Sequence, residues 1–140
     1  MGYRFVDHTA DVAADLTGRT IGELFQAAAQ ALTDTITEIS RVQTLVTQSV
    51  TLQSGSLEDL LVDWLNELLY RFEVQDMLFS DATVTIEERE QRWHLAGSVT
   101  GELFDAARHP TRVLVKSATY HALAISHDSG LWRTRVIFDI

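Results

Sequence analysis

The chain has 140 residues, 46% of them hydrophobic, and it contains no cysteine. A chain of this length predicts one domain, residues 1–140, whose core needs neither disulfides nor a structural metal. The absence of cysteine excludes zinc–thiolate sites and thiol nucleophiles, and it fits a reducing cytoplasm, where we expect the protein to be located.

The formal net charge is −9, from 20 acidic and 11 basic residues. Tight binding of nucleic acid depends on Lys and Arg that displace counterions from phosphates, so we expect no direct tight binding of RNA or DNA. The acidity suits a metal site or a basic protein partner, although solubility alone explains it equally well. No apolar run approaches the roughly 18 residues that span a bilayer, so we expect no membrane association.

Two segments of the chain have helical periodicity. Thr20 and Glu23 form a capping box before the first segment, and Ser56 and Asp59 give the second a similar start. The apolar residues at helical spacing are Ile21, Leu24, Phe25, Ala28, Leu32 and Ile36 in the first helix, and Leu57, Leu60, Leu61, Trp64, Leu65, Leu68, Leu69 and Phe72 in the second.

The remaining apolar residues alternate with period two, which predicts strands. The predicted strands cover residues 3–8, 12–16, 45–52, 82–86, 93–103, 113–125 and 132–138. This order of elements predicts an α+β fold, a two-layer sandwich in which both helices pack on one mostly antiparallel or mixed sheet.

The acids at the two ends of the chain are candidates for chemistry. The last strand reaches Asp139 and then Ile140 with its main-chain carboxylate, and DHTAD at residues 7–11 lies near the start. If the fold brings Asp139 beside Asp11, three carboxylates converge, and they repel one another unless they are protonated or bridged by a cation. Oxygen ligands suit Ca²⁺, Mg²⁺ or Mn²⁺. The pattern leaves open that Asp7 and Asp11 cap turns and Asp139 is a solvated strand end.

Lys116 lies in an otherwise apolar strand, where its ammonium group needs an acidic partner or a route to water. An acid of residues 7–11 or Asp139 is the natural partner, and an open sheet face is the equal alternative. His109, held extended by Pro110, could be a ligand or a general acid, or a loop residue bonded to nearby backbone.

Two further groups of polar residues give weaker signals. Asp63, Asn66 and Glu67 share one side of the second helix, which predicts a solvated face, with an interaction surface as the alternative. Ser117 and His121 are four residues apart on one strand, roughly 13 Å, so they do not form a nucleophile–base pair.

Several separated segments resemble one family, the archeases. The matching segments are DHTAD at 7–11, GRTIGELFQAAAQAL at 18–32, LLVDWLNELLYRFE at 60–73, GELFDAARH at 101–109, VKSATYH at 115–121 and VIFDI at 136–140. No single segment is decisive, but they follow the family's order from end to end of the chain, and the set is specific. Ser117 and Ala118 depart from the Ala-Val that is associated with this strand.

The resemblance implies a non-catalytic protein cofactor of the RNA-splicing ligase, which acts in tRNA splicing and RNA repair. Archeases speed the guanylylation of the ligase's active-site histidine by GTP and permit multiple turnover. The ligase is then the protein partner, and GTP and RNA are reached only through it.

The resemblance also implies a set of functional residues. The divalent-cation site of the family corresponds to Asp11, Asp139 and Ile140, the last through its main-chain carboxylate, with Ca²⁺ as the first choice of ion and Mg²⁺ or Mn²⁺ as alternatives. The family's functional lysine corresponds to Lys116. The residues that we expect to face the partner are Lys116, Asp7, His8, His109 and His121.

Two other classes of function are weighed against this one. A divalent-metal-dependent phosphoester hydrolase would use Asp7, Asp11 and His121 or His109, but the sequence shows no obvious activated nucleophile and no clear two-metal ligand set. A general chaperone would need an exposed apolar patch, which the sequence does not indicate.

Overall fold

A computed structural model gives the fold and describes residues 1–6, 11–120 and 123–140. The elements are β1 (Gly2–Val6), β2 (Asp11–Gly18), α1 (Ile21–Ile36), the 3₁₀ helix η1 (Ile39–Arg41), β3 (Val46–Ser54), α2 (Leu57–Gln75), β4 (Met77–Arg89), β5 (Arg92–Leu103), β6 (Ser117–Thr119), β7 (Ser126–Asp128) and β8 (Leu131–Asp139). In the part of the chain that is described, no helix is long and apolar enough to cross a membrane.

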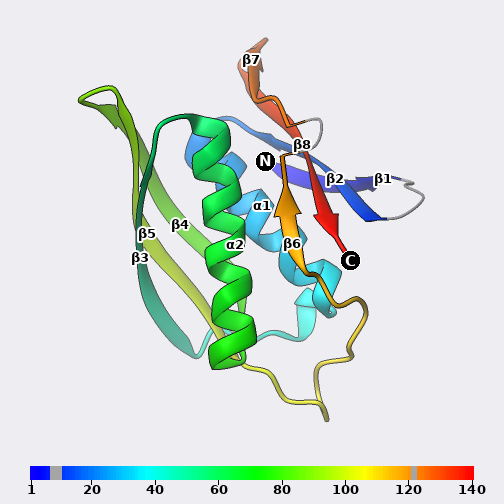
Figure 1. Cartoon of the computed structure of the whole chain (residues 1–140). Coiled ribbons are helices and arrows are strands. Elements are labelled where there is room, and N and C mark those ends of the chain that lie inside the picture. Colours follow the sequence, from blue (N-terminus) through cyan, green and yellow to red (C-terminus); the bar gives the residue numbers. More distant parts are fainter. Residues whose placement is uncertain (7–10, 121–122) are drawn as a thin grey trace.

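The two helices form a middle layer between two antiparallel sheets. Figure 1 shows α1 and α2 with the sheet β3-β5-β4 on one side and the sheet containing β1, β2, β8 and β6 on the other. α1 packs against β4 and β2, and α2 packs against β3 and β6. The predicted α+β class is confirmed. The predicted single sheet is corrected to two, because strand pairing covers the helices from both sides.

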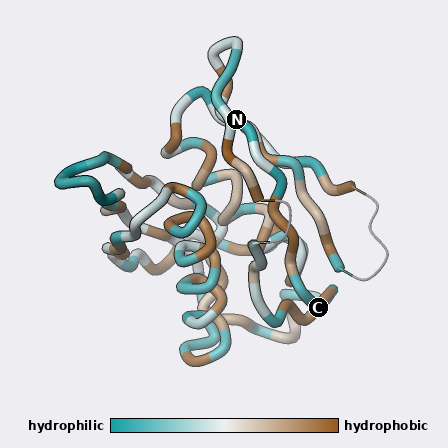
Figure 2. Tube along the Cα trace, turned by 45° about the horizontal axis from the view of Figure 1, so that its top comes forward, coloured by the Kyte–Doolittle hydropathy of each residue, from teal (hydrophilic) through white to brown (hydrophobic). Residues whose placement is uncertain are grey.

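α1 is enclosed by both sheets because it carries small side chains on several faces. Ala27, Ala28, Ala29 and Ala31 are each at most 1% exposed. A helix that is apolar around its circumference is stable only where it is buried, and alanine lets the neighbouring strands approach closely. The hydroxyl of Thr20 accepts a hydrogen bond from the N–H of Glu23, so α1 begins at the residue that the capping box predicts. Figure 2 shows hydrophobic stretches along the helices, whereas the tip of the β4–β5 hairpin is hydrophilic.

α2 is anchored to α1 by Trp64. This side chain is fully buried, and its indole N–H donates a hydrogen bond of 2.9 Å to the carbonyl oxygen of Phe25. The bond satisfies the one polar atom of the ring, so burial of the indole is favourable throughout. The hydroxyl of Ser56 accepts from the N–H of Asp59 at the start of α2, as predicted.

β8 is the strand that organises the candidate site. It pairs with β2 along one edge and with β6 and β7 along the other. Val136 and Phe138 face the helices and belong to the core, while Arg135 and Asp139 are exposed on the opposite face. This alternation is the period-two pattern predicted for residues 132–138.

The strand predicted at 113–125 is present only as β6, with β7 following at Ser126–Asp128. The chain before and after β6 is bonded to the helices instead of to a continuous strand. The N–H of Arg112 donates to the carbonyl of Ile36, and the N–H of Ile125 donates to the carboxylate of Glu58. Apolar alternation therefore overestimated the length of this strand.

Candidate metal centre

The end of β8 places one acidic side chain directly opposite another. Asp139 is the register partner of Asp11 in the antiparallel pair β2–β8, and Ile140 follows it. Register partners project from the same face of a sheet, with Cβ atoms about 4.5–5.5 Å apart. Two carboxylates at this separation repel one another unless a proton or a cation lies between them.

β6 borders the same position from the other edge of β8. Ser117 is the register partner of Asp139 on this side, and the N–H of Lys116 donates a hydrogen bond of 2.8 Å to the main-chain oxygen of Asp139. The side chain of Lys116 is exposed, and none of the ion pairs among the described residues includes it. Of the two alternatives for Lys116, the structure has the one in which the ammonium group reaches water.

The donor atoms at this end of the sheet fit a hard cation. In residues 1–6, 11–120 and 123–140, no cluster of three acidic or histidine side chains could hold a metal. Asp11 and Asp139 provide two carboxylates, and the third would be the main-chain carboxylate of Ile140. An all-oxygen set of this charge is the type that binds Ca²⁺, Mg²⁺ or Mn²⁺. The structure brings Asp11 and Asp139 together, and their binding of a cation remains a prediction.

Four residues further along β2, the arrangement of charges is different. Asp15 has Arg135 as its register partner on β8 and Arg4 as its partner on β1. The shorter hydrogen bond from Arg135 measures 2.7 Å, and that from Arg4 measures 3.1 Å. These bonds hold the pKa of Asp15 below its ordinary value, with Arg135 the main cause. Asp15 is therefore matched by charges of the chain itself, so a cation has no comparable place there.

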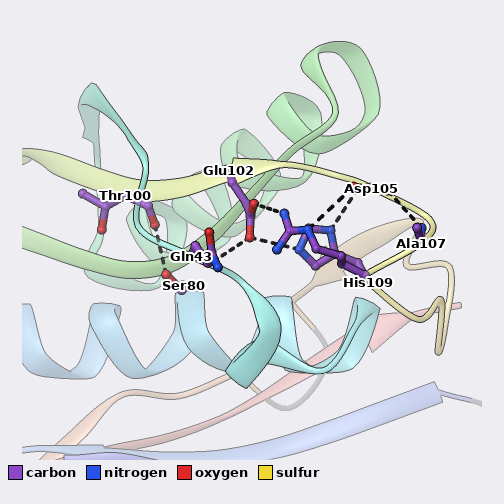
Figure 3. A network of polar contacts seen from close by, with 8 residues as sticks. Gln43, Ser80, Thr100, Glu102, Asp105, Ala107 and His109 are labelled. Carbon is purple, nitrogen blue, oxygen red and sulfur yellow. Dashed lines mark hydrogen bonds and ion pairs between the residues drawn. The ribbon is translucent and has the colours of Figure 1, made fainter.

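A second polar cluster, drawn in Figure 3, is centred on Glu102 near the end of β5. The carboxylate is 4% exposed and accepts hydrogen bonds from the guanidinium of Arg108, from the N–H of Gln43 (2.6 Å) and from the imidazole of His109 (3.1 Å). The bond from Arg108 is the main reason that the pKa of Glu102 falls to about 2. Glu102 is therefore ionised in the folded protein at neutral pH.

His109 is part of this cluster and not of the surface. Its Nδ1 accepts a hydrogen bond of 2.9 Å from the N–H of Asp105, so the ring proton lies on Nε2, which donates to Glu102. The imidazole is 1% exposed. The prediction that His109 faces a partner is thereby corrected, because both ring nitrogens are engaged within the chain. The sequence missed Glu102, whose partners lie up to 59 residues away.

One residue on the predicted polar side of α2, Asn66, has a structural role. The amide oxygen of Asn66 accepts from the N–H of Ala118 at 2.9 Å, and its amide nitrogen donates to the oxygen of the same residue at 3.5 Å. β6 is the edge of its sheet, and Asn66 satisfies its outward backbone groups as another strand would. The face was predicted to be solvated, and Asn66 instead joins α2 to β6.

Three predicted residues, Asp7, His8 and His121, lie outside the described residues. The hydrolase alternative needed Asp7 and Asp11 with His121 or His109. Since the imidazole of His109 is buried against Glu102, it is not available as a base for a substrate at Asp11.

Comparisons with known proteins agree with this fold. The Archease protein family matches residues 3–140. The archease of Methanopyrus kandleri is 35% identical over 140 residues, covering 100% of both chains, and that of Pyrococcus furiosus is 34% identical over 135 residues, covering 96% of this chain and 95% of the relative.

Two solved structures are also similar. The solution structure of protein 1598 from Methanobacterium thermoautotrophicum superposes with a TM-score of 0.87 at 34% identity, covering 99% of both chains. The crystal structure of a Thermotoga maritima archease, described as a possible chaperone, has a TM-score of 0.60 at 19% identity, covering 96% of this chain and 94% of that one, and it shows the fold alone.

Proposed function

This chain belongs to the archease family, and we propose that it is a non-catalytic, cation-binding cofactor of an RNA-splicing ligase. In this function it promotes the GTP-dependent guanylylation of the ligase and permits multiple turnover. The observation that carries the proposal is the position of Asp139 opposite Asp11, at a strand end bordered by Lys116.

The arrangement of charges supports an accessory function. Asp11, Asp139 and the carboxylate of Ile140 would hold the cation, and the exposed side chain of Lys116 lies directly before the neighbouring strand β6. When bound, the cation supplies positive charge that can offset the charge of a phosphate. The chain as a whole is acidic, with a net charge of −9, so it would approach a basic surface of the ligase readily and bare RNA poorly.

A guanylylation assay tests this proposal directly. The RNA ligase of the same organism is incubated with labelled GTP and Mn²⁺, with and without this chain, and the labelled enzyme is counted at early times. We expect faster labelling with the wild-type chain, and loss of the stimulation in Lys116→Ala and Asp139→Asn. The melting temperature of Lys116→Ala should stay near that of wild type, because the side chain is exposed.

Two results would contradict the proposal. Labelling that is equally fast without the chain would remove the accessory function. Steady hydrolysis of GTP by the isolated chain, abolished in Asp11→Asn, would favour the hydrolase instead. Filter binding of RNA at about 0.1 M salt, where the Debye length is about 10 Å, should show only weak binding by the chain alone.

A further inference from the structure

The outward side of α2 combines acidic groups with exposed apolar side chains. Asp63, Glu67, Tyr70 and Val74 follow the spacing of one helical stripe, and Tyr70 and Val74 are 55% and 62% exposed. Tyr120, which follows β6 and is 55% exposed, lies near the carboxylate of Asp59 at the start of the helix. We call these six residues the α2 outer face. Figure 1 shows α2 standing between β3 and β6.

The apolar part of the α2 outer face is suited to a protein contact. Tyr70, Val74 and Tyr120 expose apolar surface to water, and burial of this surface under a partner is favourable. Tyrosine is enriched at the centres of protein interfaces because it combines a large apolar ring with a polar tip. These three side chains therefore provide the anchoring part of a binding surface.

The charge of this face selects the kind of partner. The sequence of α2 contains five acidic residues and one basic residue, Arg71, and Arg71 is paired with Glu67 at 2.8 Å. The carboxylates of Asp59 and Asp63 raise the pKa of Tyr120, in addition to the effect of burial. A negative potential of this kind attracts a cationic surface and repels both RNA and a second copy of this chain.

The α2 outer face is continuous with the candidate metal centre through β6. Asn66 of α2 holds Ala118 from one side, and Ser117 pairs with Asp139 on the other. β6 is three residues long, so one partner could cover α2 and still reach Lys116 and the end of β8. We propose that the α2 outer face is the docking surface for a cationic, amphipathic segment of the protein partner. Identifying that partner as the ligase rests on the proposed function.

Binding of the purified ligase, measured by calorimetry, tests the docking surface. The double variant Tyr70→Arg/Val74→Arg replaces two apolar anchors with positive charge at exposed positions. The matched control is Leu45→Arg/Leu103→Arg, which also adds two positive charges, at side chains that are 69% and 59% exposed and lie outside α2. We expect the double variant to bind at least tenfold more weakly and the control to remain within twofold of wild type. Equal binding by all three proteins would overturn the proposal.

A second measurement is independent of the ligase. A synthetic helical peptide of alternating Leu and Lys turns is titrated into the ¹⁵N-labelled chain, with a Lys-rich peptide that lacks the apolar face as control. We expect chemical-shift changes at Tyr70, Val74 and Tyr120 with the amphipathic peptide only, weakening in 0.5 M NaCl. Changes confined to Asp11 and Asp139, or no preference for the amphipathic peptide, would overturn the proposal.

The two measurements separate two different failures. If the wild-type chain does not bind the ligase, the proposed function fails, and the peptide titration alone decides the docking surface. If the chain binds the ligase but the double variant binds as tightly as wild type, the docking surface is wrong and the proposed function stands. A single-stranded RNA that shifts the same α2 residues would overturn the choice of a protein partner.

Discussion

The carboxylate of Glu102 and the carboxylates of Asp11 and Asp139 have opposite surroundings. Glu102 is buried, and donors from Arg108, Gln43 and His109 all reach it. Asp139 lies at the end of β8, opposite the carboxylate of Asp11, and no ion pair within the described ranges includes it. The Glu102 cluster stabilises the loop that follows β5, whereas Asp11 and Asp139 bring two acids together at a strand end, where we propose that a cation binds.

Asp15 shows that the pairing of β2 with β8 does not in itself place two acids opposite each other. It lies on β2 four residues after Asp11, and the same two-strand register gives it Arg135 as a partner. β8 could therefore provide an arginine opposite Asp11 as well, and it provides Asp139. Where Asp15 faces an arginine across the strands, Asp11 faces a second acid, and this arrangement fits the proposed cation site. Four experiments can break or sharpen this comparison.

The largest effect is expected for Glu102→Gln. The NH₂ group of the new glutamine would face N–H groups that now donate to Glu102, so two donors would meet and buried polar groups would stay unsatisfied. The free energy of unfolding should therefore fall by about 3 kcal/mol. Urea unfolding at pH 7 measures this. The control is Glu87→Gln, an exposed residue that pairs with Arg89, and it should change stability by less than about 0.5 kcal/mol. Equal losses in the two variants would contradict the structural role of the Glu102 cluster.

The same carboxylate should make stability depend on pH. Because the pKa of Glu102 is lowered from 4.5 to about 2 by folding, its contribution is complete above pH 4.5 and is lost as the pH falls toward 2. The contribution is at most about 3 kcal/mol. Urea unfolding from pH 6 to 2.5 should show a steeper decline for wild type than for Glu102→Gln. Parallel curves would mean that Glu102 titrates alike in the folded and unfolded chains.

Asp139→Asn should act on cation binding instead of folding. Removing one of three carboxylates is expected to weaken the affinity for Ca²⁺ at least tenfold, or about 1.4 kcal/mol. Without cation the variant should be as stable as wild type or slightly more so, because repulsion with Asp11 is relieved. Calorimetry with Ca²⁺ and with Mn²⁺ measures the affinity, and Asp128→Asn on β7 is the control. Two residues appended after Ile140 should weaken binding as well, and unchanged affinity in both proteins would exclude this site.

The smallest effect is expected for Asp15→Asn. Its partners Arg4 and Arg135 are exposed, so the loss of stability at pH 7 should stay below about 1 kcal/mol. Since the pKa of Asp15 is lowered by folding, this difference should be complete above the ordinary value of 3.8, shrink as the pH falls below it, and vanish only below the lowered pKa of the folded chain. The affinity for Ca²⁺ should not change. A loss of Ca²⁺ affinity as large as that of Asp139→Asn would mean that the Asp15–Arg135 pair and the Asp11–Asp139 pair do not act separately.

The sequence by itself determined the elements whose signals are local. α1 and α2 begin where Thr20 and Ser56 cap them. Each cap is a hydrogen bond between residues three apart in sequence, so it can be predicted from the local sequence alone. The period of two over residues 132–138 likewise predicted which side of β8 faces the core. The motifs at both ends left open whether Asp139 lies beside Asp11, the resemblance implied that it does, and the register of β2 and β8 places the two residues opposite each other.

Only the tertiary structure decided which strands pair and which distant side chains hydrogen-bond to one another. The division into two sheets depends on pairings such as β3 with β5, which are long-range hydrogen bonds that apolar alternation does not specify. The hydrogen bond from Gln43 to Glu102 joins residues 59 apart in sequence, and the bond from Ala118 to Asn66 joins residues 52 apart. Local patterns give a residue's tendency to be buried or exposed, but the groups that satisfy its charge and hydrogen bonds are set by packing across the whole molecule.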